Sequence, residues 1–393
     1  MKIALVCPAS LPATQFGGIL FLSVDIAREL SKKGHQISIY TTDLDFANNA
    51  KTFSKNLPRV EKINKFYIKR SHVWFAFKLL FVNPSMFFQM KNDDFDIIHS
   101  IGVRSFQSFI AALIARRKNI PLVISDQGGL TTHPNITMGK FINKLIYRLQ
   151  SPFVRFIINQ SKKIVVANEY EKNIFLEFTN EDKISIVKNG INLEDFIKLK
   201  VDFRKKYSIS EEYVLFVGRF HTVKGVDILI KAVNEIRNFL KSKNMKCVIM
   251  GVDFGYEQEM FNLIKKYNLE NQIIVIKKPP REYVIAAYEQ SQMLVLPSRW
   301  ELSPLTPLEG FAFKKPVIST NCHGIPHTIQ DGQNCILTEM NDFKKIAESI
   351  EYLVNNENER KKMGEEGYNQ VKNECNSEEM AKRIEEVYQK LIK

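Results

Sequence analysis

Short apolar runs alternate with amphipathic segments along this chain, and the whole pattern occurs twice. The first set of runs lies between residues 2 and 168, and the second lies between residues 213 and 320. Apolar runs without polar alternation are typical of parallel strands that helices cover on both faces. The runs are KIALVC, QISIYT, FDIIHS, PLVISD and KKIVVAN in the first set, and YVLFVG, KCVIMG, NQIIVI, MLVLPS and KPVIST in the second. We therefore predict an α/β protein with two doubly wound, Rossmann-like domains.

The length of the chain agrees with two domains, because one hydrophobic core seldom holds as many as 393 residues. Asn189-Gly190 is a turn signal between the two sets of runs. We place an N-terminal domain at residues 1–190 and a second domain at residues 191–365. Residues 366–393 should form a C-terminal helix that packs back on the N-terminal domain.

The net charge is +13, and nearly all of the excess lies in the first half of the chain. Residues 1–190 contain 26 Lys and Arg against 14 Asp and Glu, whereas residues 51–163 alone contain 19 against 5. This basic window carries no zinc finger, helix-turn-helix or ribonucleoprotein signature, so we do not expect it to bind nucleic acid. An anionic membrane surface is a second candidate partner for residues 51–163.

The stretch GKFINKLIYRLQSPFVRFIINQSKK interleaves basic and apolar residues within this window. Lys140, Lys144 and Arg148 are spaced by four, so they share one helical face, and Arg155 follows. Two interpretations stay open: a solvated basic stripe on a surface helix, or an interfacial patch that contacts anionic lipid headgroups.

Three features predict a protein of the cytoplasm. The opening MKIALVC is too short for a signal peptide or a membrane span. Lys78 and Pro84 interrupt the most apolar later stretch, residues 73–90, so no spanning helix is expected there. The five cysteines form no CxxC pair, which argues against a disulfide framework or a cysteine zinc site. With the basic window added, we predict a cytoplasmic protein that docks on the inner face of the membrane.

Two cations follow the first apolar run of the second set. Arg219 and Lys224 lie in the loop after YVLFVG, before a helix that should begin near Val226. In doubly wound folds, ligands bind outside the carboxyl ends of the strands, where fixed cations and helix N-termini attract anions. The position of these two cations therefore suits a diphosphate.

Two acids bracket a helix start further along, in RWELSPLTPLEGFAF. Ser303 and Thr306 are each followed by proline, which is typical of an N-cap before the first helical residue. Either start leaves the amides of Leu305 and Thr306 free to bind a phosphate. Glu309 fits a capping box with Thr306, and it also fits a ribose diol, so both roles stay open. Glu301 caps nothing and is the stronger functional candidate.

These motifs together resemble the GT-B nucleotide-sugar glycosyltransferases, in particular the retaining family 4. The resemblance rests on Glu301-x7-Glu309 with GFAFKKPVIST, on VGRFHTVKGVDILIKA, on VKNGIN and on the early FGG loop. The four motifs occur in the family's order and extend over almost the whole chain. Neither half has GxGxxG after its first strand, which argues against a nicotinamide dehydrogenase.

The resemblance implies two domains facing a cleft, with the nucleotide sugar on the second domain and the acceptor on the first. It assigns the diphosphate to Arg219, Lys224 and the amides of Leu305 and Thr306, the ribose to Glu309, and hydroxyls of the transferred sugar to Glu301. Arg219, Lys224 and Glu301 are thus the predicted catalytic residues. No DxD motif lies in the second domain with them, so we predict a metal-independent enzyme without a cofactor beyond its nucleotide-sugar co-substrate.

Further candidates lie in the first domain. Gly17 and Gly18 would let the backbone approach the donor phosphates or the acceptor. Gln127 stands where family members frequently have a histidine, and an amide there keeps a donor and an acceptor but loses the titratable group. The full set of acceptor-side candidates is His99, Asp126, Gln127 and His133.

The predicted function is transfer of a hexose-type sugar from a nucleotide-diphosphate sugar to a glycan or lipid-linked acceptor, with retention of configuration. Two alternatives stay open. A GT-B sugar-nucleotide epimerase would bind the same diphosphate without needing an acceptor, and an inactive binding subunit would keep Arg219 and Lys224 without turnover.

Overall fold

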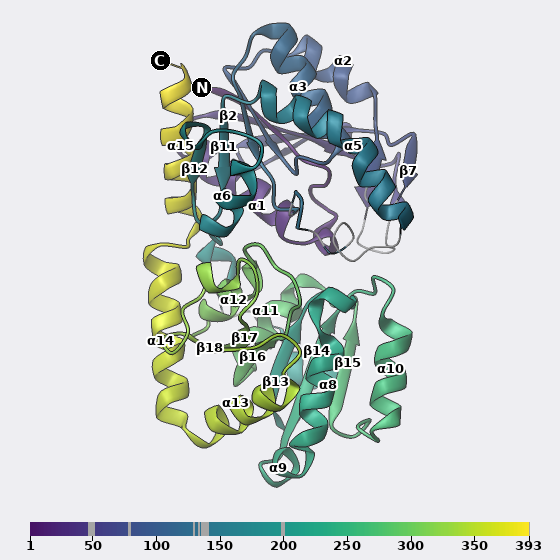
Figure 1. Cartoon of the computed structure of the whole chain (residues 1–393), viewed down its shortest axis with the longest axis vertical. Coiled ribbons are helices and arrows are strands. Elements are labelled where there is room, and N and C mark those ends of the chain that lie inside the picture. The colour runs from purple at the N-terminus through teal and green to yellow at the C-terminus, as the bar shows by residue number, and fades with distance from the viewer. Residues whose placement is uncertain are drawn as a thin grey trace. The chain divides into compact units, whose positions relative to one another are not determined.

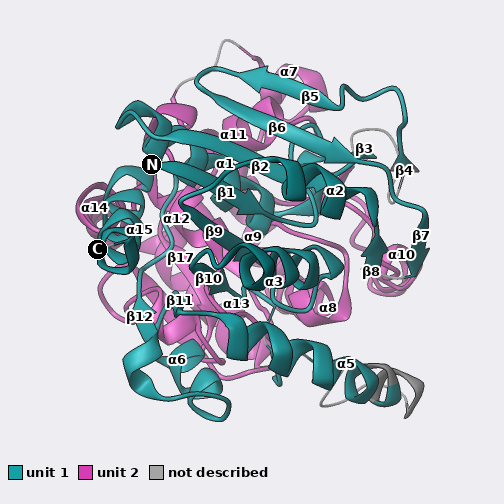
Figure 2. Ribbon diagram, turned by 90° about the horizontal axis from the view of Figure 1, so that it is seen from above, with its two compact units in different colours: residues 1–191, 377–393 teal, residues 192–376 magenta. Residues whose placement is uncertain are grey.

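The computed structural model describes residues 1–45, 52–77, 80–128, 130–132, 134, 141–197 and 201–392, and gives the backbone alone for 52, 141–144 and 146. The chain forms two compact units, one of residues 1–191 with 377–393 and the other of residues 192–376 (Figure 2). Both units are α/β, with a mainly or entirely parallel main sheet (Figure 1). The predicted fold class is confirmed.

Unit 1 is built on an eight-stranded sheet in the order β12-β11-β10-β9-β1-β2-β6-β5, in which only the edge pair β5–β6 is antiparallel. Its strands are β1 (Lys2–Val6), β2 (Gln36–Thr42), β5 (Val60–Ile63), β6 (Phe66–Ser71), β9 (Ile97–Ile101), β10 (Leu122–Ser125), β11 (Lys163–Val166) and β12 (Ile184–Ile186). Its helices are α1 (Gly18–Lys32), α2 (Ser85–Asn92), α3 (Phe106–Lys118), α5 (Phe141–Gln160), α6 (Glu169–Leu176) and α15 (Ser377–Ile392). Two small antiparallel pairs are separate from this sheet: β3 (Leu44–Asp45) with β4 (Thr52–Phe53), and β7 (Phe75–Phe77) with β8 (Leu80–Val82).

Unit 2 is built on a six-stranded, entirely parallel sheet in the order β15-β14-β13-β16-β17-β18. Its strands are β13 (Glu212–Val217), β14 (Met245–Gly251), β15 (Ile273–Lys277), β16 (Met293–Leu296), β17 (Val317–Thr320) and β18 (Cys335–Thr338). Its helices are α7 (Phe203–Tyr207), α8 (Val226–Glu235), α9 (Arg237–Ser242), α10 (Glu257–Lys266), α11 (Arg281–Gln290), α12 (Leu305–Phe311), α13 (Phe343–Asn355) and α14 (Glu357–Asn373). Phe216, Val295 and Ile318 of its strands pack with Leu229 of α8 and Ile350 of α13 in one buried core.

Each sheet has one position where the strand order reverses. In unit 2, β13 lies between β14 and β16, and in unit 1, β1 lies between β2 and β9. The helices that follow two such strands diverge to opposite faces, which leaves a crevice outside the strands' carboxyl ends. The loops after β13 and β16 in unit 2, and after β1 and β9 in unit 1, therefore occupy the ligand-binding position of this fold.

The second crossing between the units differs from the predicted boundary at residue 365. Residues 366–376 belong to unit 2, because they continue α14, which packs on α12 and buries Met363 and Val371. The chain leaves unit 2 between Asn376 and Ser377, so only α15 belongs to unit 1.

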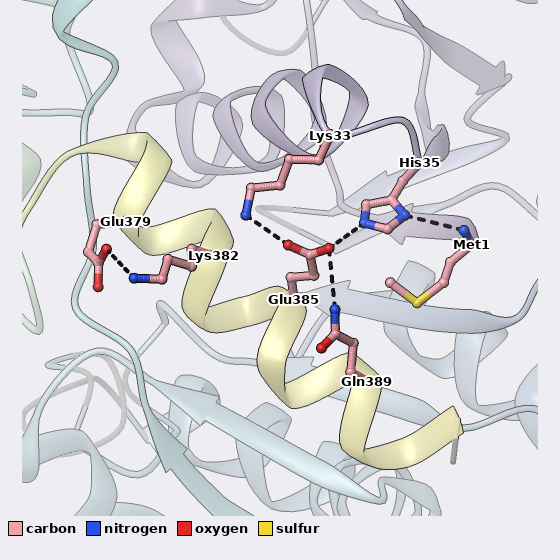
Figure 3. Close-up of polar contacts among 7 residues, drawn as sticks. All are labelled: Met1, Lys33, His35, Glu379, Lys382, Glu385 and Gln389. Carbon is pink, nitrogen blue, oxygen red and sulfur yellow. Dashed lines mark hydrogen bonds and ion pairs between the residues drawn. The ribbon is translucent and has the colours of Figure 1, made fainter.

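Polar contacts fix α15 to the N-terminal part of unit 1 (Figure 3). The Glu385 carboxylate pairs with Lys33 and with the ring of His35, each at 2.8 Å, and His35 also contacts the amino group of Met1 at 3.2 Å. Near the start of the helix, the Ser377 hydroxyl donates a hydrogen bond to Glu29 of α1 at 3.2 Å. These contacts join the two ends of the chain within one unit.

The interpretation of His99 as an acceptor contact is wrong, because this side chain lies in the core. His99 is fully buried, and its two ring nitrogens contact the hydroxyl groups of Tyr388 at 2.6 Å and Ser125 at 2.8 Å. Burial lowers the pKa of His99 to about 3. The ring is therefore neutral, and it links β9 to β10 and α15.

We expect His99→Asn to be less acid-sensitive than the wild type. An unfolded chain binds the His99 proton below a pKa of about 6.5, whereas the folded chain does not, so His99 costs the wild type about 2 kcal/mol of stability at about pH 5 relative to about pH 7. The asparagine variant lacks the contacts of the His99 ring at both pH values. Asparagine binds no proton in this pH range, however, so the variant does not have the pH-dependent loss of stability that His99 causes. The difference in unfolding free energy between the proteins should thus narrow by that amount on acidification. Tyr388→Phe keeps the histidine and serves as the control; an equal difference at both pH values for His99→Asn would contradict the argument.

Residues 73–90, the most apolar stretch of the first half, form β7, β8 and α2 in their described part. Among all residues that the structure describes, no helix combines the length and the apolar character needed to cross a bilayer. The five cysteines are buried, and none of them forms a disulfide bond.

Candidate functional site

Two cations occupy the loop between β13 and α8, at the switch point of unit 2. The Lys224 ammonium ends the short 3₁₀ turn Thr222–Lys224 and forms an ion pair with Oε1 of Glu301. The Arg219 guanidinium is half-buried and lies 5.1 Å from the ring centre of Phe254. Arg219 makes no hydrogen bond with any residue in the described part of the chain. It is therefore a fixed cation whose donors are free for a ligand.

The pKa values of groups in this loop reflect its positive electrostatic potential. Burial lowers the pKa of His221, and the nearby cations Arg219 and Lys224 lower it further. Nδ1 of His221 accepts a hydrogen bond from the amide of Val223 at 3.2 Å, which requires the neutral ring. Burial also lowers the pKa of Arg219, an effect that Glu301 opposes. An anion bound here would offset the electrostatic cost of burying the Arg219 guanidinium.

The loop after β16 brings Glu301 to this cation pair. Glu301 is 7% exposed, and its Oε1 accepts hydrogen bonds from Lys224 and from the Ser298 hydroxyl, the latter at 3.1 Å. Oε2 accepts no hydrogen bond from the described residues. One carboxylate oxygen thus holds the loop together, and the other is open to a hydroxyl group.

A glycine permits this approach of the two loops. Gly225 has a φ of +68°, and a Cβ built on it would lie 1.8 Å from the carbonyl oxygen of Pro297. Only glycine tolerates this conformation and this contact without a backbone shift. Gly225 therefore lets the β13 loop and the β16 loop pack closely enough for Lys224 to meet Glu301.

The helix start after Glu301 differs from the prediction. α12 begins at Leu305 with Pro304 at the N-cap, and no side chain caps it, so neither Ser303 nor Thr306 is the N-cap. Leu305 and Thr306 are the first two helical residues, whose amides have no acceptor within a helix. Proline occupies the third position, where an N–H is likewise not needed. The start of α12 thus presents two amides, beside the loop that holds Glu301.

The capping-box interpretation of Glu309 is wrong. Glu309 is 6% exposed, and it lies within α12 rather than in its first turn. Oε1 accepts a hydrogen bond from Arg281 at 2.7 Å, and Oε2 accepts one from the Tyr288 hydroxyl at 2.6 Å. Both partners come from α11. The carboxylate therefore has a fixed orientation set by side chains that are distant in sequence.

In unit 1, Gly17 and Gly18 lie where the chain after β1 enters α1. Gly17 has a φ of +106° and occupies the N-cap of α1, and Gly18 is its first residue. The loop follows the strand at the switch point of unit 1. A left-handed conformation favours glycine, so the sequence FGG is suited to this turn.

Gln127 also follows a strand of unit 1 and has a left-handed φ of +60°. Its side-chain amide pairs with that of Asn189 through two hydrogen bonds of 3.2 Å, and its backbone N–H donates to Glu171 at 3.3 Å. Burial raises the pKa of the Glu171 carboxyl to about 7, and the neighbouring Asp126 carboxylate adds to the rise. The orientation of Gln127 is therefore fixed before any ligand binds.

Asp126 does not face an acceptor, and that prediction is wrong. This side chain is 2% exposed, and its Oδ2 accepts a hydrogen bond from the amide of Leu130 at 2.7 Å. Asp126 thus holds the loop after β10 together. His133, the remaining acceptor-side candidate, lies outside the described residues.

Sequence reasoning missed several residues that support the site. Glu171, Ser298, Arg281 and Tyr288 act through contacts with residues from other elements, and local sequence carries no signal for such pairs. Gly225 did have a signal, because a glycine directly after Lys224 separates a 3₁₀ turn from a helix.

Comparisons with known proteins identify the family and the fold of this chain. Residues 200–370 match the family described as Glycosyl transferases group 1, and residues 16–195 match Glycosyltransferase Family 4. An uncharacterized glycosyltransferase of Methanocaldococcus jannaschii is 29% identical over 71% of this chain and 71% of its own length. CapM, a capsular polysaccharide biosynthesis glycosyltransferase of Staphylococcus aureus, is 28% identical over 56% of this chain and 59% of its own length.

Among solved structures, Anabaena HepE in complex with UDP-glucose aligns over 100% of both chains, with a TM-score of 0.77 at 15% identity. This likeness shows the fold, so the two units are those of the GT-B architecture. The chain belongs to the retaining glycosyltransferase family 4, whose two family matches together span both units. It is a glycosyltransferase that takes its sugar from a nucleotide sugar.

Proposed function

We propose that this chain transfers a hexose-type sugar from a uridine-diphosphate sugar to a glycan or lipid-linked acceptor. The observation that carries the proposal is the group of Arg219, Lys224 and Glu301 at the switch point of unit 2. A complex of HepE with UDP-glucose supports uridine diphosphate as the donor's leaving group. The likeness to CapM supports a saccharide acceptor.

The cations act on the leaving group. Cleavage of the bond between the sugar and the diphosphate places negative charge on the departing phosphate, and preorganised donors stabilise such charge strongly in a site that excludes water. Arg219 supplies donors that are free in the described structure, and Lys224 supplies a cation held by Glu301. The amides of Leu305 and Thr306 add the helix start, which favours anions.

The remaining polar groups fix the sugar and the nucleoside. Glu301 offers its open oxygen to a hydroxyl of the transferred sugar, and Glu309 accepts hydrogen bonds from the ribose diol. Gly17, Gly18 and Gln127 belong to unit 1, and we assign them to the acceptor side or to the donor phosphates. The net positive charge of residues 51–163 supports docking of this unit on an anionic membrane surface, at the inner face of the membrane.

Proton NMR of the pure protein with a panel of nucleotide sugars tests the proposal. We expect a UDP-hexose to disappear only when a saccharide or lipid-linked acceptor is added, and the new anomeric signal to keep the donor's configuration. Conversion of the donor into an isomer without any acceptor would instead identify an epimerase. Binding of the donor by saturation transfer, with no turnover for any acceptor, would identify an inactive subunit. Arg219→Ala is the control for turnover by a contaminating enzyme.

A further inference from the structure

Unit 1 exposes three aromatic side chains on one small β-ribbon. Trp74 directly precedes β7, and Phe75 and Phe77 lie within it; their exposed fractions are 72%, 57% and 47%. Successive residues of a strand point to opposite faces, so a strand with exposed neighbours on both sides is covered on neither. The strand β7 therefore exposes its aromatic side chains, whereas Phe81 of β8 is buried and packs the ribbon on the unit.

α5 exposes a second apolar strip. Leu145, Leu149 and Phe153 recur at a spacing of four and are 45%, 66% and 53% exposed. Val154, Ile157 and Ile158 of the same helix are buried and hold it on the unit. Helical residues spaced by four share one face, so the strip is exposed from Leu145 to Phe153 and continues into the buried Ile157.

The ribbon and α5 are anchored on the same helix. The side-chain amide of Gln107 in α3 donates a hydrogen bond to the carbonyl of Phe81 in β8 at 2.8 Å. Two residues later, the ring of Phe109 packs edge-on against Phe153 of α5, with ring centres 5.3 Å apart. Both views place β7 and α5 on the same side of unit 1 (Figures 1 and 2). We call the exposed apolar residues of these two segments the insertion surface.

The chain segment around α5 carries charge of one sign. Residues 127–168, which include all of α5, contain six Lys and Arg and no Asp or Glu. Arg148 and Arg155 of α5 are exposed beside the apolar strip. A second copy of this chain would bring like charges together, whereas anionic lipid headgroups would complement them. Aromatic and aliphatic side chains flanked by arginine are also suited to the boundary between headgroups and acyl chains.

We propose that the insertion surface penetrates an anionic bilayer, with the side chains of Trp74, Phe75, Phe77, Leu145, Leu149 and Phe153 entering the headgroup and acyl boundary. The inference rests on the membrane docking included in the proposed function, and it goes further by naming the residues and the mode of contact. Charge attracts unit 1 to the membrane, and apolar burial holds it there. The binding is then less sensitive to salt than charge alone allows.

Trp74 provides an internal probe. The chain has two tryptophans, and the other, Trp300, is 8% exposed and belongs to unit 2. In a Trp300→Phe background, all tryptophan emission comes from Trp74. We expect vesicles of phosphatidylcholine with phosphatidylglycerol to shift this emission to shorter wavelength, and vesicles brominated on the acyl chains to quench it at least twofold. Vesicles of phosphatidylcholine alone should have little effect.

Variants separate insertion from attraction by charge. Phe75→Ser with Phe77→Ser and Leu149→Gln should lower partition to anionic vesicles about tenfold and abolish the quenching, while the melting temperature stays close to that of the parent. Met340→Ser, at a residue of unit 2 that is 46% exposed, is the matched control and should bind as the parent does. Arg148→Gln with Arg155→Gln should weaken binding mainly at low salt.

Three results would overturn the inference. Binding to anionic vesicles without acyl-chain quenching would show docking by charge alone. Equal recovery in the supernatant with and without anionic lipid would remove the membrane as a partner. Concentration-dependent dimers in analytical ultracentrifugation, lost in the triple variant, would assign the surface to a second copy. Sugar transfer to a water-soluble acceptor reports the proposed function separately, and should be unchanged in the triple variant.

Discussion

Arg219→Ala and Lys224→Ala should each lower kcat/KM for sugar transfer by roughly a hundredfold or more. Removal of one preorganised donor to a developing negative charge typically costs about 2.7 to 4 kcal/mol in the transition state. Each 1.36 kcal/mol corresponds to a factor of about ten in rate, so the expected loss lies between roughly a hundredfold and a thousandfold. Steady-state kinetics that follow release of the nucleoside diphosphate measure it.

The two variants should differ in stability, which separates catalysis from folding. Arg219 has no hydrogen-bond partner among the described residues, so Arg219→Ala should melt as the wild type does. Lys224→Ala leaves the buried Glu301 with only the Ser298 hydroxyl, and we expect its melting temperature to fall. Lys231→Ala is the control, because that lysine is 39% exposed and its ion pair with Asp227 is long, at 3.9 Å. Near-normal turnover of a folded Arg219→Ala variant would remove this residue from the site.

The fold was largely predictable because buried parallel strands appear in the sequence as continuous apolar runs. All ten runs of the sequence overlap a strand of the two main sheets, but four strands of these sheets, β5, β6, β12 and β18, correspond to no run. The strand β6 was missed, since FYIKRS mixes aromatic and basic residues. Arg70 of this strand is nevertheless 1% exposed, and its guanidinium is paired with Glu61 and with the carbonyls of Leu11 and Pro58. A buried charge whose partners lie elsewhere in the chain looks like a surface residue in the sequence.

The site was predictable where its residues belong to loops at strand ends. Arg219, Lys224 and Glu301 lie in loops after β13 and β16, and the strand order brings those loops together. The start of α12 was placed incorrectly, because two Ser/Thr-Pro steps offered local caps that the folded chain does not use. The helix begins at Leu305 without a side-chain cap, so neither local cap determines its start.

Pairings between distant elements could not be predicted at all. His99 was a candidate to replace the histidine that family members frequently have where Gln127 stands, yet Tyr388, in the last helix of the chain, occupies one of its ring nitrogens. Asp126 follows a strand, which is a common position for a ligand-binding acid. Its carboxylate instead accepts a hydrogen bond from the amide of Leu130 in the same loop. Glu309 matched a capping box in spacing, whereas its partners come from α11. In all three cases the residue type suggested a function, but the sequence did not reveal the residue's hydrogen-bond partner.

Glu309→Gln should weaken binding of uridine diphosphate and also destabilise unit 2. In the structure the carboxylate is the ion-pair partner of Arg281 at 2.7 Å, and loss of one member of a buried pair typically costs about 3–5 kcal/mol. Tyr288→Phe removes one hydrogen bond to Glu309 but keeps the charge pair, so it should have a smaller effect on both quantities. Calorimetry and thermal melting measure them.

Glu309→Gln would also lower the affinity for uridine diphosphate if Glu309 had only a structural role. A contact between Glu309 and the ribose therefore has to be tested by a separate measurement. The wild type should bind uridine diphosphate more tightly than its 2′,3′-dideoxy analogue, because Glu309 accepts hydrogen bonds only from the natural diol. Glu309→Gln should lose most of this preference, whereas Tyr288→Phe should keep it. In Arg281→Gln with Glu309→Gln both buried charges are absent, and we expect stability to recover in part while the preference for the diol stays lost. If Glu309→Gln discriminates between the two nucleotides as well as the wild type does, Glu309 serves only to pair with Arg281, and another group must hold the ribose.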